Sequence, residues 1–381
     1  MSPTALLFLE LGGILFGLAV LARFAGRLGI SPIPLYLLGG LAFGEGGLVP
    51  VFTSRDFIEV GAQLGVVLLL FMLGMEYSGD ELTQGLKSGA AAGTVDLIAN
   101  FVPGFLAGLV IGLGPLDSLF LGGITYISSS GVVAKLLADL GWTGNRETPI
   151  VLSILVFEDL AMAMILPILG AVALGGSLAG TIGSVVAALA LVGVILAIAS
   201  RHGDQLSRVA FSGTNEVNLL TVLGVTLIVA GLAEQIHISA AVGAFLVGLG
   251  VSGDAANRLR GLLLPLRDLF AGIFFVFFGL SIDPTALPQV AGYAIALALL
   301  TGASKAVTGW WAARRAGISI RGRRRAATIL LARGEFSIII AGLGISAGVD
   351  ARLGPIAAGY VLVMAAAGPL LARLAAQRTA A

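Results

Sequence analysis

Long apolar stretches alternate along the chain with short segments rich in glycine, proline or charged residues. An apolar run of about 20 residues is the length that a helix needs to cross the hydrocarbon core of a bilayer. The pattern therefore predicts a multi-pass protein with roughly thirteen membrane-spanning helices. Their predicted limits are 5–22, 31–48, 57–76, 86–112, 116–138, 148–173, 178–200, 214–234, 236–252, 263–282, 288–313, 324–347 and 354–376.

The basic residues test this count, because an error of one span would scramble their alternation between the two sides of the membrane. With the N-terminus outside, 18 of the 22 Lys and Arg residues fall in inward loops or the C-terminal tail, and only Arg55 and Arg352 fall in outward loops. Trp310 and Trp311 stand near the inward end of their span, as interfacial anchors do. The N-terminus is therefore predicted outside and the C-terminus inside.

Composition supports a membrane protein. Hydrophobic residues make up 57% of the chain and charged residues 11%, whereas about a quarter of a soluble domain is charged. The net charge of +1 argues against a nucleic-acid partner, and the absence of cysteine excludes disulfides and thiolate metal sites. No basic residue precedes the first apolar run, so it is predicted to be a retained span rather than a cleaved signal.

A faint internal repeat relates two parts of the chain. Gly40 and its neighbours match the surroundings of Gly248 at a shift of 208 residues, and Gly74 matches Gly279 at a shift of 205. Both shifts pass over seven predicted spans, an odd number, so the copies must run in opposite directions, as in many secondary transporters. The alternative is a chance likeness between glycine-rich helices.

Two adjacent carboxylates, Glu158 and Asp159, stand in the middle of an otherwise apolar predicted span. A charge at the bilayer centre costs at least about 2.5 to 3.5 kcal/mol, so such residues are functional candidates. Neighbours on a helix diverge by about 100°, so the two side chains must point in different directions. A buried carboxylate holds either a proton or a cation, and competition for one such site couples two ion fluxes.

Lys305 lies inside another span, where a buried ammonium needs a carboxylate partner. The sequence offers Glu158, Asp159 and Glu335 as partners. The alternative is that the long side chain reaches the membrane surface.

Polar residues and glycine interrupt two further spans. Ser128, Ser129 and Ser130 precede a glycine in one of them, and Arg333-Gly334-Glu335 interrupts the other. Ser and Gly favour local unwinding, and a broken helix would present backbone groups to an ion at the midplane. Intact helices packed through small residues are the alternative. Asp96 and Asn100, one turn apart, could hydrogen-bond to each other, and a structural bond and a role in transport both stay open.

These motifs together resemble the Kef-type members of the second monovalent cation:proton antiporter family, most closely the bacterial potassium/proton antiporters of the Kht type. The motifs that carry the resemblance, which extends over essentially the whole chain, are Ser128-Ser129-Ser130-Gly131-Val132-Val133, Glu158-Asp159, Lys305 and Arg333-Gly334-Glu335-Phe336. The resemblance implies an all-α polytopic membrane protein with inverted repeats and two crossed discontinuous helices, the sodium/proton antiporter fold. The whole chain, 1–381, would form one exchanger domain.

The resemblance further implies an elevator mechanism in a homodimer. Core helices at about 86–173 and 288–376 would move against dimerisation or scaffold helices at about 5–76 and 214–282, with a linker helix at about 178–200. Asp159 would carry the cation or the proton, with Glu158 beside it and Ser128, Ser129 and Ser130 as further ligands. By the same resemblance, Lys305 is the counter-charge that modulates Asp159, and Arg333 and Glu335 are also expected to be modulating charges.

The expected function is exchange of a monovalent cation, potassium first and sodium second, for protons across the bacterial inner membrane, without a cofactor. Glutamate stands before Asp159, where relatives have aspartate or glutamine, so the cation and the charge moved per cycle stay open. No soluble regulatory domain is expected within the chain. Regulation would come from a separate cytoplasmic subunit or be absent, and truncation of a longer protein stays open. The alternatives are a proton-linked organic-anion carrier, an intramembrane hydrolase and a passive cation channel.

Overall fold

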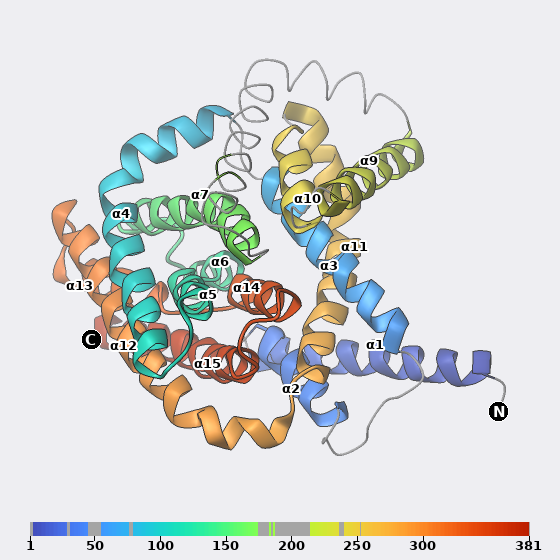
Figure 1. Cartoon of the computed structure of the whole chain (residues 1–381). Helices are drawn as coiled ribbons and strands as arrows, with labels where there is room; N and C mark the ends of the chain where they lie inside the picture. The colour runs from blue at the N-terminus through green and yellow to red at the C-terminus, as the bar shows by residue number, and fades with distance from the viewer. Residues whose placement is uncertain are drawn as a thin grey trace. The chain divides into compact units, whose positions relative to one another are not determined.

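The structure, a computed structural model, describes residues 3–28, 31–44, 55–75, 79–173, 214–235, 240–251 and 253–380, with two isolated positions, 183 and 186. Every regular element in these ranges is a helix (Figure 1). The helices are α1 (Pro3–Leu28), α2 (Ile33–Phe43), α3 (Arg55–Met75), α4 (Gly79–Val110), α5 (Pro115–Tyr126), α6 (Ser130–Asp139), α7 (Thr148–Ala173), α9 (Asn215–Gln235), α10 (Ala240–Leu249), α11 (Gly253–Leu280), a 3-10 turn (Pro284–Ala286), α12 (Leu287–Arg315), α13 (Ile320–Ile329), α14 (Glu335–Ser346) and α15 (Leu353–Ala380).

Each predicted span except 178–200 coincides with a described helix or helix pair, and 178–200 lies outside the described residues apart from positions 183 and 186. Seven helices in the described ranges are long and apolar enough to cross a membrane by length and composition alone. The chain is therefore a multi-pass membrane protein, and the count of thirteen spans stays a prediction. The seven stretches are Phe8–Leu28, Ala90–Val110, Thr148–Val172, Asn215–Ala233, Arg258–Leu280, Pro284–Arg315 and Leu353–Ala376.

Some predicted limits are wrong by more than a turn. Helix α4 begins at Gly79 rather than at residue 86, and α11 begins at Gly253 rather than at residue 263. Both helices start with polar turns before their apolar stretch. Hydropathy reports only the part of a helix that matches the hydrocarbon core, whereas backbone hydrogen bonding continues beyond it. In the segment predicted at 31–48, α2 ends at Phe43, and residues 45–48 lie outside the described part of the chain.

Two of the predicted spans are broken, as the sequence predicts. Residues 127–129 separate α5 from α6, and residues 330–334 separate α13 from α14. The two unwound segments contact each other at a place called the crossing below, where the backbone N–H of Ser129 donates to the carbonyl of Ala332 at 2.9 Å. At membrane depth, the polar groups of unwound backbone need hydrogen-bond partners within the protein. The bond between Ser129 and Ala332 provides one such partner on each segment.

The chain folds as two compact units. Unit 1 comprises Met1–Arg55, Ser88–Asp159 and Phe275–Ala381, and unit 2 comprises Asp56–Lys87 and Leu160–Phe274. Unit 1 contains the crossing and most of the predicted core helices, together with residues 1–55, which the prediction assigns to the scaffold. The predicted division into core, scaffold and linker stays a prediction.

In unit 1, α12, α13 and α15 pack against one another, and α14 packs against α5 and α15 (Figure 1). Buried side chains from α6, α7 and α13, among them Val133, Ile154 and Ile329, form a hydrophobic core with the Trp142 ring. In unit 2, α3, α9, α10 and α11 enclose a second core that includes Phe71, Val222, Ala244 and Leu263.

One helix contact occurs twice, between glycines that the repeat relates. In unit 1, a Cβ added to Gly40 would lie 2.8 Å from the Cα of Gly279. In unit 2, a Cβ added to Gly248 would lie 2.9 Å from the Cα of Gly74. Because the repeat relates Gly40 to Gly248 and Gly279 to Gly74, the two contacts are equivalent. This equivalence supports a repeat over a chance similarity. In both contacts, glycine lets the two helix backbones approach closely, as small residues do between membrane helices.

Candidate functional site

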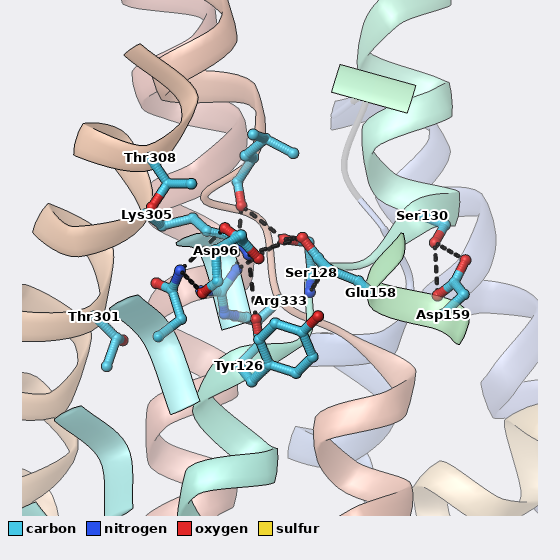
Figure 2. A network of polar contacts seen from close by, with 12 residues as sticks. Asp96, Tyr126, Ser128, Ser130, Glu158, Asp159, Thr301, Lys305, Thr308 and Arg333 are labelled. Carbon is cyan, nitrogen blue, oxygen red and sulfur yellow. Dashed lines mark hydrogen bonds and ion pairs between the residues drawn. The ribbon is translucent and has the colours of Figure 1, made fainter. Parts of the chain in front are cut away.

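Glu158 and Asp159 are both buried near the middle of α7 and point in different directions, as their adjacent positions require. Figure 2 shows Glu158 among the charged side chains of the crossing and Asp159 turned toward Ser130. The pair therefore has two separate environments, both within unit 1.

Glu158 is held by Lys305 and by the unwound segment before α6. Its Oε1 atom accepts from Lys305 Nζ at 2.7 Å and from the Ser128 hydroxyl at 3.1 Å. Its Oε2 atom accepts from the backbone N–H of Ser128. Bonds between ionised groups are among the strongest hydrogen bonds, so this carboxylate is fixed in place.

Lys305 lies between two carboxylates. Its ammonium, fully buried on α12, donates to Asp96 Oδ2 at 2.6 Å as well as to Glu158. It also donates to the Tyr126 carbonyl at 3.3 Å and lies 5.5 Å from the centre of the Tyr126 ring. Of the three partners that the sequence offers, Glu158 makes this ion pair, and Asp96 is a second partner that the sequence analysis missed.

Asp96 is fixed by a chain of side-chain amide and hydroxyl groups. The Asn100 amide donates to Asp96 Oδ1 at 3.0 Å, which confirms the predicted pair on α4. Asn100 in turn accepts from the Ser304 hydroxyl at 2.8 Å. Because Ser304 precedes Lys305, α12 both supplies the ammonium and orients its acidic partner.

Arg333 is fully buried in the second unwound segment. It donates through Nη1 to the Ser128 hydroxyl and to the Leu330 carbonyl, both at 3.1 Å, and through Nε to the Tyr360 hydroxyl at 3.0 Å. Tyr360 also lies 2.9 Å from the Thr301 hydroxyl. This guanidinium therefore ties the two broken helices to α15.

Among the described residues, the acidic and basic side chains with no exposed surface are equal in number. Asp96 and Glu158 are the two acidic groups, and Lys305 and Arg333 are the two basic groups. Buried charges are tolerated when they are paired and hydrogen-bonded, and breaking such a pair costs several kcal/mol. The cluster around Glu158 therefore forms a neutral, strongly coupled network.

The Asp159 carboxylate, on α7, contacts the first residue of α6. This residue is Ser130, and its hydroxyl donates to Asp159 Oδ2 at 3.1 Å. Carboxylate and hydroxyl oxygens are ligands that suit hard cations of low charge. Asp159 and Ser130 together can therefore hold a proton or a cation.

The three predicted serine ligands have three different partners. Ser128 bonds to Glu158 and Arg333, Ser130 bonds to Asp159, and the Ser129 hydroxyl donates to Glu335 Oε2 at 2.8 Å. The structure thus brings Ser130 to Asp159 and places Ser128 in the neutral network. The roles of these residues in ion binding stay predictions.

Tyr360 was not singled out by sequence reasoning. It lies in the last, largely apolar helix, and its hydroxyl also donates to the Thr125 carbonyl at 3.4 Å. The sequence signal that could have identified it is a tyrosine in the middle of an apolar span, because the hydroxyl of a buried tyrosine usually has a hydrogen-bond partner.

The fold and the site define a class, that of polytopic helical membrane proteins with crossed broken helices around buried carboxylates. Over residues 14–377 the chain matches the family described as "Sodium/hydrogen exchanger, transmembrane". The chain therefore belongs to this family of cation/proton antiporters, and it is a transporter rather than an enzyme. This finding removes the hydrolase alternative.

Individual relatives agree with this family. The chain is 35% identical over 376 residues to the K(+)/H(+) antiporter subunit KhtU of Bacillus subtilis, covering 96% of this chain and 93% of KhtU. It is 30% identical over 338 residues to the ammonium/H(+) antiporter subunit AmhT of Alkalihalophilus pseudofirmus, covering 87% of this chain and 85% of AmhT. Among solved structures, the sodium proton antiporter MjNhaP1 from Methanocaldococcus jannaschii matches with a TM-score of 0.73 at 17% identity, covering 99% of both chains, and shows the same fold.

Proposed function

We propose that this antiporter exchanges potassium for protons and that both ions compete for Asp159. The observation that carries the proposal is the buried ion pair between Glu158 and Lys305. Glu158 is committed to Lys305 and to two bonds from Ser128, whereas Asp159 faces the hydroxyl of Ser130. A cation entering at Glu158 would have to displace the Lys305 ammonium, so we assign the exchange to Asp159, whose carboxylate contacts Ser130 at the start of α6.

Potassium is the first candidate cation because KhtU is named a potassium/proton antiporter subunit and matches this chain over nearly its full length. Sodium stays the second candidate, and ammonium joins the candidates through AmhT. All three carry one positive charge. A hydrated cation must lose part of its water to bind, and a site of carboxylate, hydroxyl and backbone oxygens replaces that water.

The contacts of Lys305 support a proposal for the charge moved per cycle. Lys305 bonds to both Asp96 and Glu158, so these three side chains hold one another in place and are not assigned to carry the transported ions. Asp159 alone then alternates between one proton and one cation. The exchange is one for one and moves no net charge across the membrane.

The conformational cycle is alternating access of an elevator type. The crossing moves as one piece, since Ser129, Ala332 and Arg333 join both broken helices by direct hydrogen bonds. The predicted core helices move against the scaffold of a homodimer in the bacterial inner membrane, with the N-terminus outside and the C-terminus cytoplasmic. A separate cytoplasmic regulatory subunit fits the names of KhtU and AmhT, both of which are called antiporter subunits.

Exchange in vesicles tests the proposal. The purified chain is reconstituted, an outward gradient of potassium, sodium or ammonium is imposed in turn, and internal pH is followed at several clamped voltages. We expect saturable, cation-driven uphill proton movement, fastest with potassium and independent of voltage. Cation flux that moves no protons uphill would indicate a passive channel, and voltage-dependent rates would contradict the one-for-one exchange.

A further inference from the structure

A dense group of arginines lies where α12 ends and α13 begins. Six arginines fall within residues 314–325, a stretch without any acidic residue. Two of them have partners inside the protein. Arg325 pairs with Glu147 at 3.3 Å, and Arg323 donates to the Ile318 carbonyl at 2.7 Å. Four remain exposed, and within the described part of the chain none of the four forms an ion pair, namely Arg314, Arg315, Arg321 and Arg324.

These four arginines share one end of a helical hairpin. Residues 316–319 connect α12 to α13, and Gly317 takes a φ of 71°, a left-handed conformation that glycine adopts without strain. The helices approach closely, since a Cβ on Gly309 would lie 2.6 Å from the Ala326 carbonyl oxygen. Arg321 and Arg324 are three residues apart and therefore share a face of α13.

Apolar and aromatic side chains accompany the charges. Ile320, at the start of α13, is 58% exposed. The Arg315 guanidinium lies 5.5 Å from the centre of the Trp311 ring, near the end of a stretch long enough to span the bilayer. Tryptophan and exposed apolar side chains at the end of a span mark the boundary between headgroups and acyl chains. A soluble partner would not require this combination.

We propose that Arg314, Arg315, Arg321 and Arg324 form a binding site for the phosphate of an anionic phospholipid headgroup. Arginine binds phosphate oxygens in a planar, two-pronged geometry, and clusters of four or more basic residues next to a span bind anionic lipids. A lipid held by both helix ends clamps α12, which carries Lys305, to α13, the first half of the second broken helix. The site does not depend on which ion is transported.

Lipid binding to the full chain in detergent tests the proposal without any transport assay. Native mass spectrometry measures how tightly phosphatidylglycerol and phosphatidylcholine are retained. Each arginine near an anionic surface contributes roughly a fivefold change in affinity, so Arg321→Gln with Arg324→Gln should weaken phosphatidylglycerol binding about 25-fold and leave phosphatidylcholine unchanged. Arg321→Lys with Arg324→Lys keeps the charge and should retain most of the affinity.

A matched pair on another helix separates a defined site from general attraction of basic residues to acidic lipid. Arg23 and Arg27 are exposed, four residues apart on α1, and predicted on the same side of the membrane. Arg23→Gln with Arg27→Gln should leave phosphatidylglycerol binding unchanged. Equal losses in the two pairs, or unchanged affinity in the Arg321 and Arg324 variant, would overturn the proposal. Full displacement of the lipid by millimolar inorganic phosphate would assign the site to free phosphate instead.

Discussion

Gly334 lies against Ser129 where the two unwound segments cross. A Cβ on Gly334 would be 2.6 Å from the Ser129 hydroxyl oxygen and 2.8 Å from its Cβ. The contact leaves no space for a Cβ at this position, so packing requires glycine here. The crossing is therefore closed at this point to any larger side chain.

Gly334→Ala should force the crossing apart. Overpacking of a well-packed interior typically costs about 1 to 3 kcal/mol, and we expect a loss of that size in the free energy of unfolding together with slower exchange. Unfolding in detergent and vesicle flux measure the two effects. Gly292→Ala on α12 is the control, because a Cβ there meets nothing within 4 Å. Equal stability of the two variants would show that the contact is not tight.

Removal of Lys305 should be more damaging than removal of either of its partners. Lys305→Met leaves Asp96 and Glu158 buried without their counter-charge, and breaking such a pair costs about 3 to 5 kcal/mol. A triple variant that adds Asp96→Asn and Glu158→Gln should recover most of that loss. Chemical unfolding of the purified variants measures it. A triple variant no more stable than Lys305→Met alone would contradict the coupling of the three charges.

Arg325 should stabilise the junction between the α6–α7 loop and α13. It pairs with the nearly buried Glu147, and its guanidinium lies 5.2 Å from the centre of the Trp142 ring. Arg325→Ala should lower the free energy of unfolding by about 1 to 2 kcal/mol, the combined loss of a partly buried ion pair and a cation–π contact. The exposed neighbour supplies the control, as Arg324→Ala should change stability by less than about 0.5 kcal/mol. A reversed order would refute this role.

The loop between α14 and α15 should respond to acid. Arg352 donates a hydrogen bond of 2.8 Å to Asp350, which lowers the pKa of this carboxyl below its usual value. The pair therefore stabilises the fold above the unfolded pKa of about 4, and this contribution is lost as pH falls through the lowered folded pKa. Because the pair is largely exposed, Arg352→Gln should cost less than about 1 kcal/mol at pH 7, and this cost should shrink as pH falls through the lowered folded pKa. Unfolding measured against pH checks this, and a difference that grows in acid would have the wrong sign.

The sequence predicts much of the fold because the bilayer restricts what an apolar run can do. Spans, broken helices and the repeat all follow from local composition and periodicity. The breaks at Ser129 and Gly334 could be predicted because consecutive polar residues beside a glycine in mid-span favour unwinding over a continuous helix. The limits of α4 and α11 could not, since hydropathy does not report the polar turns that extend a helix beyond the membrane.

The site was only partly predictable for a related reason. A local pattern identifies Glu158 and Asp159 as a buried pair and requires them to diverge, but it does not say which one faces Lys305. That assignment depends on contacts between residues far apart in the chain, such as Asp96 with Lys305 at a separation of 209 positions. Tyr360 was missed because its role comes from the hydroxyl and guanidinium groups around it rather than from its own neighbours in sequence.

Asp159 is the residue on which the proposed exchange depends, and its conversion to the neutral, equally sized asparagine tests that directly. In vesicles with an outward potassium gradient, Asp159→Asn should show no potassium-driven proton movement while its unfolding midpoint in detergent stays within the range of the wild type. Asp139→Asn, the same change at an exposed carboxylate on α6, should exchange at the wild-type rate. Potassium-driven proton movement by Asp159→Asn at the wild-type rate would contradict the account.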